Sequence, residues 1–252
     1  MATAAHAQSP PVGQLWYSAD VGASLLDAPG YVARSNYVGD GLGAHRVRFA
    51  IPGLPPRANL HDFQIDANGD VLFSLDVGVT LGGLYFDPAD VIAYAGGVFV
   101  KAFNASAAGV PKGVRCDGVA RSGNSGALWL SFDRTFKVGN VTIVPADVIA
   151  VSGAGFGAKV LDARALGLPA ALNIDAIDSI NSPTDLLVSF DTGGAIAGIA
   201  FADEDLLQLH LADSSWSKRF TLRTISARWA AANLDGLSTS PQSDVIFYNG
   251  FN

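Results

Sequence analysis

The sequence predicts an all-β fold, a β-propeller-like ring of four or five four-stranded repeat units. Three observations predict it. The phrase Leu15-Trp-Tyr-Ser-Ala-Asp20 returns as Leu128-Trp-Leu-Ser-Phe-Asp133. Apolar residues alternate or run in short blocks bounded by Gly, Pro, Asn and Asp, which is typical of strands. No stretch of the chain keeps a convincing helical period.

The repeated phrase has a regular spacing. Its successive copies place Ser18, Ser74, Ser131, Ser189 and Tyr248 at steps of 56, 57, 58 and 59 residues. One unit of four short strands cannot bury its apolar faces alone, so its copies must stack on one another. A closed ring is the most economical way to do this. We expect one domain over residues 14–252, with units at about 15–71, 72–127, 128–185 and 186–252.

Each unit begins with the serine strand. In Val71-Leu-Phe-Ser-Leu-Asp76 the apolar block indicates burial on both faces, with the serine facing inward and bonded to backbone. Fourteen residues after the closing aspartate, a second aspartate opens another strand. This spacing occurs three times, from Asp76 to Asp90, from Asp133 to Asp147 and from Asp191 to Asp205.

Two further strands complete the unit. A third strand is expected at 98–103, 156–161 and 220–225, and a loop with Gly, an aliphatic residue and Pro follows it twice. The fourth strand carries another recurring aspartate, at Asp62, Asp117, Asp175 and Asp235. A hairpin turn then leads back to the next serine strand, with turn chemistry at Asn68-Gly69, Gly123-Asn124, Ser182-Pro183 and Ser240-Pro241.

The first unit departs from the pattern. Arg34 stands where the other units have the second aspartate, and the surrounding segment is rich in turn formers. The serine strand also occurs five times, whereas complete units number four. An N-terminal strand that pairs beside the C-terminal one would close the ring with four or five blades. A truncated longer array would give the same pattern.

Composition limits the classes of function. The formal net charge of −7 and a sequence pI of about 4.9 exclude an electrostatic footprint for nucleic acid or an anionic membrane. Cys116 is the single cysteine, and its apolar neighbours predict a buried thiol. No apolar run is long enough to span a bilayer. Residues 1–13, with Ala5-His6-Ala7, predict an export-signal remnant or a disordered tail, hence a secreted, periplasmic or cell-surface protein.

Several motifs resemble uncharacterised tandem-repeat modules of secreted bacterial proteins. In those modules phrases like "DIDAL", "LLFSLD" and "DEDL" and a glycine-marked "FDGSALGL" recur. The corresponding stretches here are 174–177, 72–76, 203–206 and 161–168. The resemblance spans about residues 60 to 250 and implies an exported, non-enzymatic repeat domain. It supplies no assigned site.

Acidic residues are the candidates for metal binding. Asp66-Ala-Asn68-Gly-Asp70 resembles the start of a calcium loop, but the rest of the loop is absent and a hairpin turn suffices. Better candidates gather oxygen donors before a strand. The alternative is that these aspartates accept backbone N–H bonds, and repetition favours it. The sequence therefore predicts no cofactor, with calcium as the alternative at Asp87, Asp90, Asp203, Glu204 and Asp205.

The candidate binding residues are His210, Asp213 and Trp216. They lie at 210–219, where residues 211–219 read as an insertion specific to the last unit, and segments that break a repeat often carry function. Trp216 could stack on a sugar or a peptide, or it could cover the edge of a blade. Trp16 and Trp129 occupy equivalent repeat positions and are expected in the core.

These patterns favour an exported, non-enzymatic binding or scaffold module with a glycan or protein ligand. One alternative is a hydrolase that uses His210 or His45 with nearby acids at one mouth of the ring. The histidines do not recur with the repeat, and no Gly-x-Ser-x-Gly elbow is present in the sequence. Another alternative is a subunit of a cell-surface assembly.

Overall fold

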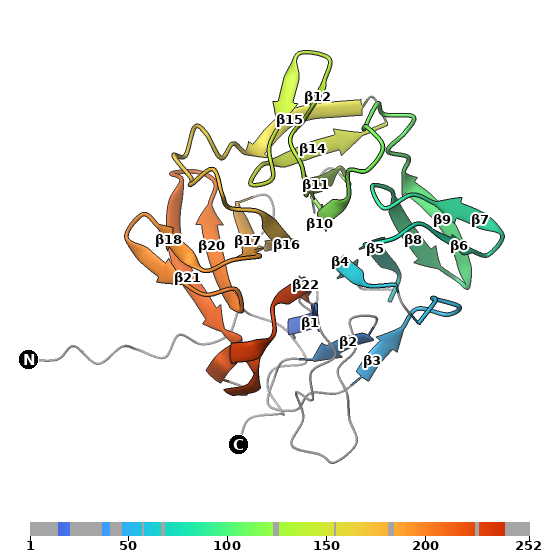
Figure 1. Cartoon of the computed structure of the whole chain (residues 1–252), viewed down its shortest axis with the longest axis horizontal. Helices are drawn as coiled ribbons and strands as arrows, with labels where there is room; N and C mark the ends of the chain where they lie inside the picture. Colours follow the sequence, from blue (N-terminus) through green and yellow to red (C-terminus); the bar gives the residue numbers. More distant parts are fainter. Residues whose placement is uncertain are drawn as a thin grey trace, which may run out of the picture.

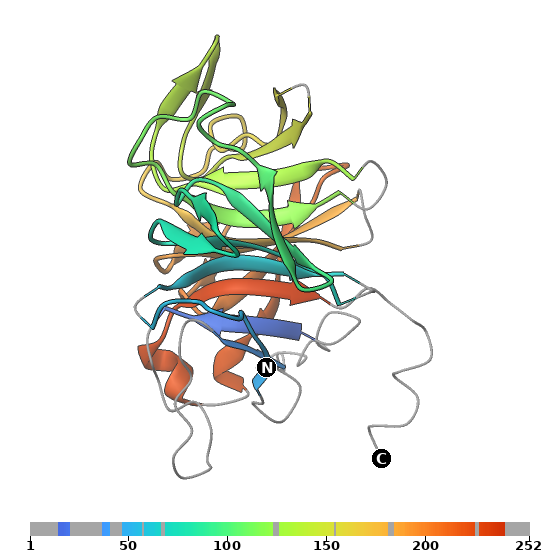
Figure 2. The ribbon, with the colours of Figure 1, turned by 90° about the vertical axis from the view of Figure 1, so that its right-hand side faces the viewer.

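A computed structural model describes residues 15–20, 37–40, 47–56, 58–66, 69–122, 126–153, 155–180, 184–224 and 227–239 of the chain. Within this part, four antiparallel four-stranded sheets are arranged around a common axis like the blades of a propeller (Figure 1). The predicted all-β, propeller-like fold is confirmed. Figure 2 gives the side view of the same blades.

Each blade has an inner strand at the axis and three strands that follow it outwards. Blade 1 contains β22 (Leu234–Thr239), β1 (Leu15–Ala19), β2 (Tyr37–Asp40) and β3 (Val47–Ala50). Blade 2 contains β4 (Leu60–Ile65), β5 (Val71–Leu75), β8 (Val91–Ala95) and β9 (Val98–Phe103). Blade 3 contains β10 (Cys116–Arg121), β11 (Leu128–Phe132), β14 (Val148–Ser152) and β15 (Gly155–Leu161). Blade 4 contains β16 (Ile174–Ile180), β17 (Asp185–Phe190), β20 (Asp205–His210) and β21 (Ser215–Thr221).

Blade 1 joins the two ends of the described chain. The N-terminal strand β1 pairs antiparallel with the C-terminal strand β22, with Trp16 opposite Ser238. Of the two alternatives left open by the sequence, the structure has the pairing of the N-terminal and C-terminal strands, which gives four blades among the described residues. The fifth copy of the serine phrase and Arg34 lie outside those residues, as do most residues of the predicted hairpin turns.

A two-stranded hairpin separates the second and third strands of blades 2, 3 and 4. These hairpins explain the spacing of fourteen residues, and they were not predicted from the sequence. They turn at pairs such as Gly82-Gly83 and Ala197-Gly198, whose positive φ angles suit a tight hairpin. Their strands are β6 (Val79–Leu81) with β7 (Leu84–Phe86), β12 (Phe136–Val138) with β13 (Val141–Ile143), and β18 (Gly194–Ile196) with β19 (Ile199–Phe201).

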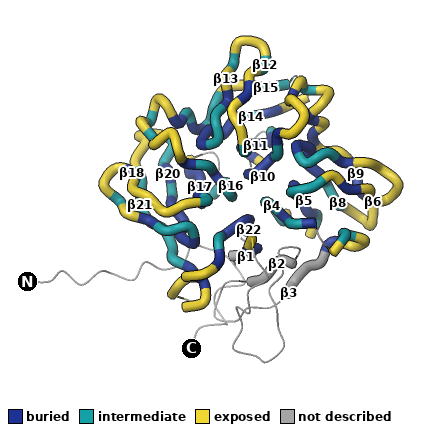
Figure 3. Tube along the Cα trace, viewed as in Figure 1, coloured by how far each residue is buried: buried dark blue, intermediate teal, exposed yellow. Residues whose placement is uncertain are grey.

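Apolar side chains fill the spaces between successive blades. On β11, Leu128, Leu130 and Phe132 pack toward blade 2, whereas Trp129 packs toward blade 4. Both faces of the serine strand are therefore buried, as predicted, and exposed residues are concentrated in the outer parts of the blades (Figure 3). Cys116 is fully buried, and burial raises the pKa of its thiol.

The last unit differs from the predicted pattern in its third strand. That strand is β21 (Ser215–Thr221) rather than 220–225, and the 3-10 helices η1 (Leu222–Thr224) and η2 (Ala227–Ala231) follow it. The segment 211–219 is therefore a hairpin turn and a regular blade strand, not an insertion. No described helix has the length and apolar character required to cross a membrane.

Candidate binding site at the axial mouth

One carboxylate lies on the axis of the ring and bonds to every blade. Oδ1 of Asp62 accepts the backbone N–H groups of Phe63 and Leu237, at 2.8 and 3.0 Å. Oδ2 accepts those of Val119 and Ile177, at 2.7 and 3.0 Å. The inner edge of an inner strand has no neighbouring strand, so its N–H groups need another acceptor. Asp62 provides that acceptor for blades 1, 2, 3 and 4 at once.

The environment of Asp62 combines burial with hydrogen bonding. Asp62 is 0% exposed, and burial raises its pKa well above the ordinary value, while its four backbone donors act in the opposite direction. Four donors match the ionised carboxylate, which has only acceptor sites. Loss of this charge would weaken Asp62 as the acceptor of four buried backbone N–H groups.

The position of Asp62 corrects the predicted alignment of the inner strands. Leu60, Cys116, Ile174 and Leu234 begin the four inner strands and are fully buried. The residue equivalent to Asp117, Asp175 and Asp235 is therefore His61, one position before Asp62. At the position of Asp62, the other blades carry Gly118, Ala176 and Gly236. A Cβ at Gly118 would lie 2.3 Å from Oγ of Ser131, so the serine strand leaves little room there.

A second axial layer follows two residues later along the inner strands. Oδ1 of Asp178 accepts the N–H of Ser179 and Nε2 of Gln64, while Oδ2 accepts the N–H and hydroxyl of Thr239. Gln64 in turn accepts the N–H of Arg121, and Ser238 accepts that of Ile65. Burial raises the pKa of Asp178 to about 6, although the bonds from Thr239 oppose the shift.

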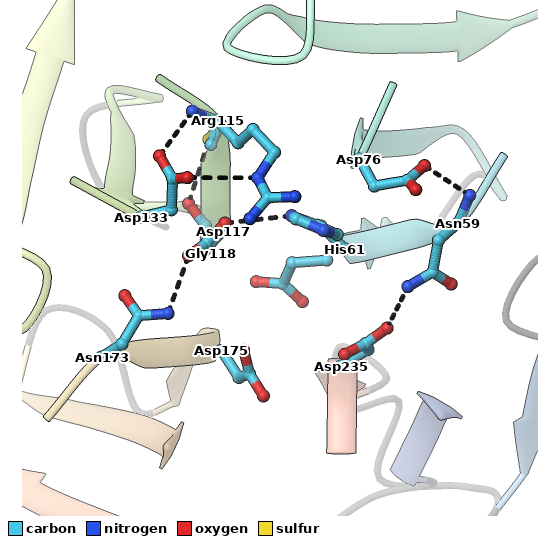
Figure 4. A network of polar contacts seen from close by, with 12 residues as sticks. Asn59, His61, Asp76, Arg115, Asp117, Gly118, Asp133, Asn173, Asp175 and Asp235 are labelled. Carbon is cyan, nitrogen blue, oxygen red and sulfur yellow. Dashed lines mark hydrogen bonds and ion pairs between the residues drawn. The ribbon is translucent and has the colours of Figure 1, made fainter. Parts of the chain in front are cut away.

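The starts of the inner strands form one mouth of the ring, which we call the acidic mouth. It contains His61, Asp117, Asp175 and Asp235, one residue from each blade (Figure 4). The preceding asparagines bond across the blade boundaries. Asn59 donates to Asp235 at 2.5 Å, Asn173 donates to Asp117 at 2.9 Å, and Asn233 donates to Asp175.

His61 and Arg115 break the fourfold pattern of the acidic mouth. At the other three blade boundaries, an asparagine of one blade donates to an aspartate of the preceding blade. At the boundary between blades 2 and 3, Arg115 replaces the asparagine and His61 replaces the aspartate. Nδ1 of His61 lies 3.0 Å from Oδ1 of Asp117. Nε of Arg115 pairs instead with Asp133 in its own blade, at 3.1 Å (Figure 4). The acidic mouth thus has one sector that differs chemically from the rest.

The acidic mouth shifts the pKa values of its own groups. Burial raises the pKa of Asp175 well above its ordinary value, and the charges of Asp235 and Asp117 raise it further. Burial also raises the pKa of Asp235 to about 7, against the opposing hydrogen bond from Asn59. Burial lowers the pKa of His61, but the bond to Asp117 and its charge outweigh that effect, so the pKa is raised.

The aspartates at the start of β8, β14 and β20 hold neighbouring backbone in place. Asp90 accepts the N–H groups of Asp87 and Ala105 and pairs with Lys101 at 2.6 Å. Asp147 repeats this with Val144, Ala163 and Lys159. Asp205 accepts the N–H of Ala202 and pairs with Lys218, but its Oδ1 is buried and has no hydrogen-bond partner among the described residues. The predicted backbone-acceptor role is confirmed. The lysines 11, 12 and 13 residues after these aspartates are the sequence signal for these ion pairs, and that signal was not recognised.

The candidate metal ligands have the following positions. Asp90 and Asp205 face lysines, Asp87 donates its N–H to Asp90, and Glu204 pairs with Arg223. Asp203 accepts the N–H of Leu234 through its backbone carbonyl. The described residues contain no group of three or more His, Cys, Asp or Glu side chains arranged to hold a metal ion. Calcium stays the alternative to a chain without a cofactor, and these contacts test neither.

The turn between β4 and β5 contains the described part of the calcium-like motif. The N–H of Asp66 donates to the carbonyl of Asp70, and Oδ1 of Asp66 accepts the N–H of Asp70. These are the contacts of a closed hairpin turn.

The three predicted binding residues lie away from the acidic mouth. His210 ends β20, next to the start of β17, whereas the acidic mouth lies beside the opposite end of β17. Nδ1 of His210 lies 2.5 Å from Oδ1 of Asp185, and Asp213 accepts the N–H and hydroxyl of Ser215. Trp216 is half-buried and packs against the core between blades 3 and 4. The three share one hairpin, but nothing in these contacts tests a ligand.

Other sequence predictions have mixed outcomes. The hydroxyl of Ser189 donates to the carbonyl of Leu234, as expected, but the hydroxyls of Ser18, Ser74 and Ser131 have no partner among the described residues. Trp129 is buried in the core as predicted, and the side chain of Trp16 lies outside the description.

The hydrolase hypothesis needs a histidine that reaches both a hydroxyl and a carboxylate. Within the described part of the chain, neither His61 nor His210 hydrogen-bonds to a hydroxyl. His6 and His45 lie outside that part.

Several solved structures are distantly similar to the chain. No family model and no curated protein sequence matches the chain. YCF48 from Cyanidioschyzon merolae is similar at 6% identity and TM-score 0.35 over 64% of this chain, which spans 40% of that protein's length. A crystal structure of a Nidogen/Laminin complex is similar at 9% identity and TM-score 0.40, covering 89% of this chain and 97% of that one. A protein of unknown function from Bacteroides caccae is similar at 12% identity and TM-score 0.38, covering 84% and 73%.

Proposed function

We propose that the chain is an exported, non-enzymatic binding or scaffold module that uses the acidic mouth to bind a cationic group of a protein partner. The observation that carries this proposal is the set of three carboxylates from three blades at the acidic mouth. Among the described residues, no lysine or arginine forms an ion pair with Asp175 or Asp235. Burial is the largest cause of the raised pKa of Asp175, and the charges of Asp235 and Asp117 raise it further, which agrees with a site that lacks a countercharge.

The chemistry of this mouth favours a lysine or arginine side chain over an anionic or apolar ligand. A positive group there would relieve the repulsion between Asp175 and its neighbours and would gain charge-assisted hydrogen bonds. His61 and Arg115 break the symmetry of the ring, so the partner would bind in one orientation. The closed ring supports the binding role because it holds these groups at fixed positions.

Calorimetric titration with a short lysine-rich peptide tests the proposal. We expect binding that weakens with added salt and strengthens as the pH rises through about 7, because Asp235 ionises there. Asp175→Asn should reduce the affinity at least tenfold. Asp213→Asn, which removes a carboxylate from the opposite side of blade 4, is the matched control and should change it little. Equal affinity of the native protein for lysine-rich and glutamate-rich peptides would contradict the proposal.

A second candidate is a subunit of a cell-surface assembly. It is favoured by four exposed apolar side chains on β7 and β9 of blade 2: Leu84, Tyr85, Val98 and Val100. Large exposed apolar groups gathered in one blade are typical of contact surfaces. Light scattering on the native protein and on the Val98→Lys variant tests it. Assembly that Val98→Lys abolishes would support this role, and a native monomer would contradict it.

A further inference from the structure

An open cavity of about 570 Å³ lies between blades 2 and 3. Its apolar part comes from Phe103, Leu128 and Val151, which are all buried in the core between these blades. Among the described residues that line it, Arg121, at the end of β10, is the one that carries a charge. A cavity of this size suits a small organic molecule. It is separate from the acidic mouth, because Arg121 ends the inner strand that Cys116 and Asp117 begin.

The interface between blades 3 and 4 shows why this cavity exists. Ala108 and Leu166 hold the same place in equivalent loops, since their N–H groups donate to the carbonyls of Asn104 and Asp162. Gly153 and Leu211 both follow directly after the third strand of a blade. Leu166 and Leu211 pack against the core between blades 3 and 4. The corresponding alanine and glycine leave that space empty between blades 2 and 3.

Comparison of the same two interfaces also shows a difference in the polar part of the cavity. Arg121 pairs with Leu128 across the strands, as Ser179 pairs with Leu186 in the next blade. Arginine therefore replaces a serine where the apolar lining has been reduced. No described carboxylate forms an ion pair with the Arg121 guanidinium. In a chain with a formal net charge of −7, a guanidinium that has no ion-pair partner among the described residues and lies at a partly apolar cavity favours an anionic ligand group.

We infer that the cavity between blades 2 and 3 is a binding site for a small, largely apolar carboxylate. The apolar body of the ligand lies against Phe103, Leu128 and Val151, which removes apolar surface from water. Its carboxylate accepts hydrogen bonds from the guanidinium of Arg121, whose planar fork can hold both oxygens. The site is independent of the cationic partner proposed for the acidic mouth.

Titration calorimetry with octanoate, and with octan-1-ol as the uncharged analogue, tests the inference. We expect octanoate to bind the native protein at least tenfold more tightly than octan-1-ol. In NMR spectra, the largest shifts should come from the methyl groups of Leu128 and Val151. No detectable octanoate binding at millimolar concentration would overturn the inference. Equal affinity for the two probes would overturn the role of Arg121.

Two variants copy the blade 3–4 interface and serve as matched controls. Ala108→Leu with Gly153→Leu fills the cavity, and a Cβ at Gly153 has nothing within 4 Å. This variant should lose octanoate binding at least tenfold, and unchanged affinity would refute the site. Arg121→Ser should lower the affinity for octanoate about tenfold and leave that for octan-1-ol unchanged. If the filled variant does not fold, Arg121→Ser decides alone, because the hydrogen bond to Oε1 of Gln64 uses only the backbone N–H of residue 121 and remains possible.

Discussion

The axial layer of Asp62 and the acidic mouth both connect the blades through carboxylates, but the carboxylates are arranged in opposite ways. At the axis a single unrepeated carboxylate accepts one N–H group from each of the four blades. At the acidic mouth three blades each contribute their own aspartate, and asparagines link them in pairs. The contrast teaches that repeated residues stabilise local joints, whereas a residue present once can hold the whole ring.

The largest effect should come from removing the shared carboxylate. In Asp62→Asn, one oxygen becomes an NH₂ group that faces N–H donors, so two buried donors lose their acceptor. We expect the free energy of unfolding to fall by about 3–5 kcal/mol, or the cooperative transition to disappear. Denaturant unfolding followed by circular dichroism measures this. A loss below about 1 kcal/mol would mean that the axial bonds are dispensable.

The second effect compares two of the recurring aspartates, Asp147 and Asp205. Asp147→Asn should cost about 2–3 kcal/mol, because Asp147 bonds to two N–H groups and to Lys159. Asp205→Asn should cost only about 1–2 kcal/mol, since Oδ1 of Asp205 has no described partner to lose. Parallel unfolding curves measure both. Equal costs would show that the second backbone N–H bond of Asp147, from Ala163, contributes nothing.

The third effect is a pH dependence of stability. The pKa of Asp235 is raised to about 7 in the folded chain from an ordinary value of 3.8. The folded state therefore holds an extra proton between these values, so stability is present at low pH and is lost as the pH rises through about 7. We expect the native protein to lose about 2 kcal/mol between pH 5 and pH 8 from this group. Asp235→Asn should remove that part of the slope, and an unchanged slope would contradict the assignment.

The smallest effect concerns the hairpin between β18 and β19. Ala197 has a φ of 51°, whereas the equivalent Gly139 has a φ of 58° and carries no Cβ. Ala197→Gly should stabilise the protein by roughly 0.5 kcal/mol, because relief of the left-handed backbone outweighs the entropy cost of glycine. Gly139→Ala is the reverse control and should destabilise by about 1 kcal/mol. Thermal midpoints of the two variants should move in opposite directions.

The sequence predicted the features that repetition makes visible. The serine phrase predicted four or five blades and burial of both faces of β5, β11 and β17, and it offered the pairing of β1 with β22 as one of two alternatives. The spacing from Asp133 to Asp147 was also recognised, but the hairpin inside it was not, because its strands have only three residues each. Strands this short do not show a clear alternation of apolar and polar residues.

Features that occur once in the ring, and are not repeated in every blade, were not predicted. Asp62 was aligned with the recurring aspartates Asp117, Asp175 and Asp235. The residue of blade 2 that is equivalent to them is His61, one position earlier. A single carboxylate that gathers N–H groups from four blades depends on residues up to 175 positions away, and no local pattern encodes such contacts. The cavity beside Arg121 was missed for a related reason, because small residues such as Gly153 are also ordinary turn residues.

Hydrogen exchange of four backbone amides tests the central claim most directly. In the native protein the N–H groups of Phe63, Val119, Ile177 and Leu237 should be among the slowest to exchange, because each donates to buried Asp62. In Asp62→Gly we expect all four to exchange at least tenfold faster together, and formate should restore part of the protection. If only Phe63 accelerated while the amides of the other three blades kept their native rates, the single axial carboxylate would not hold the ring together.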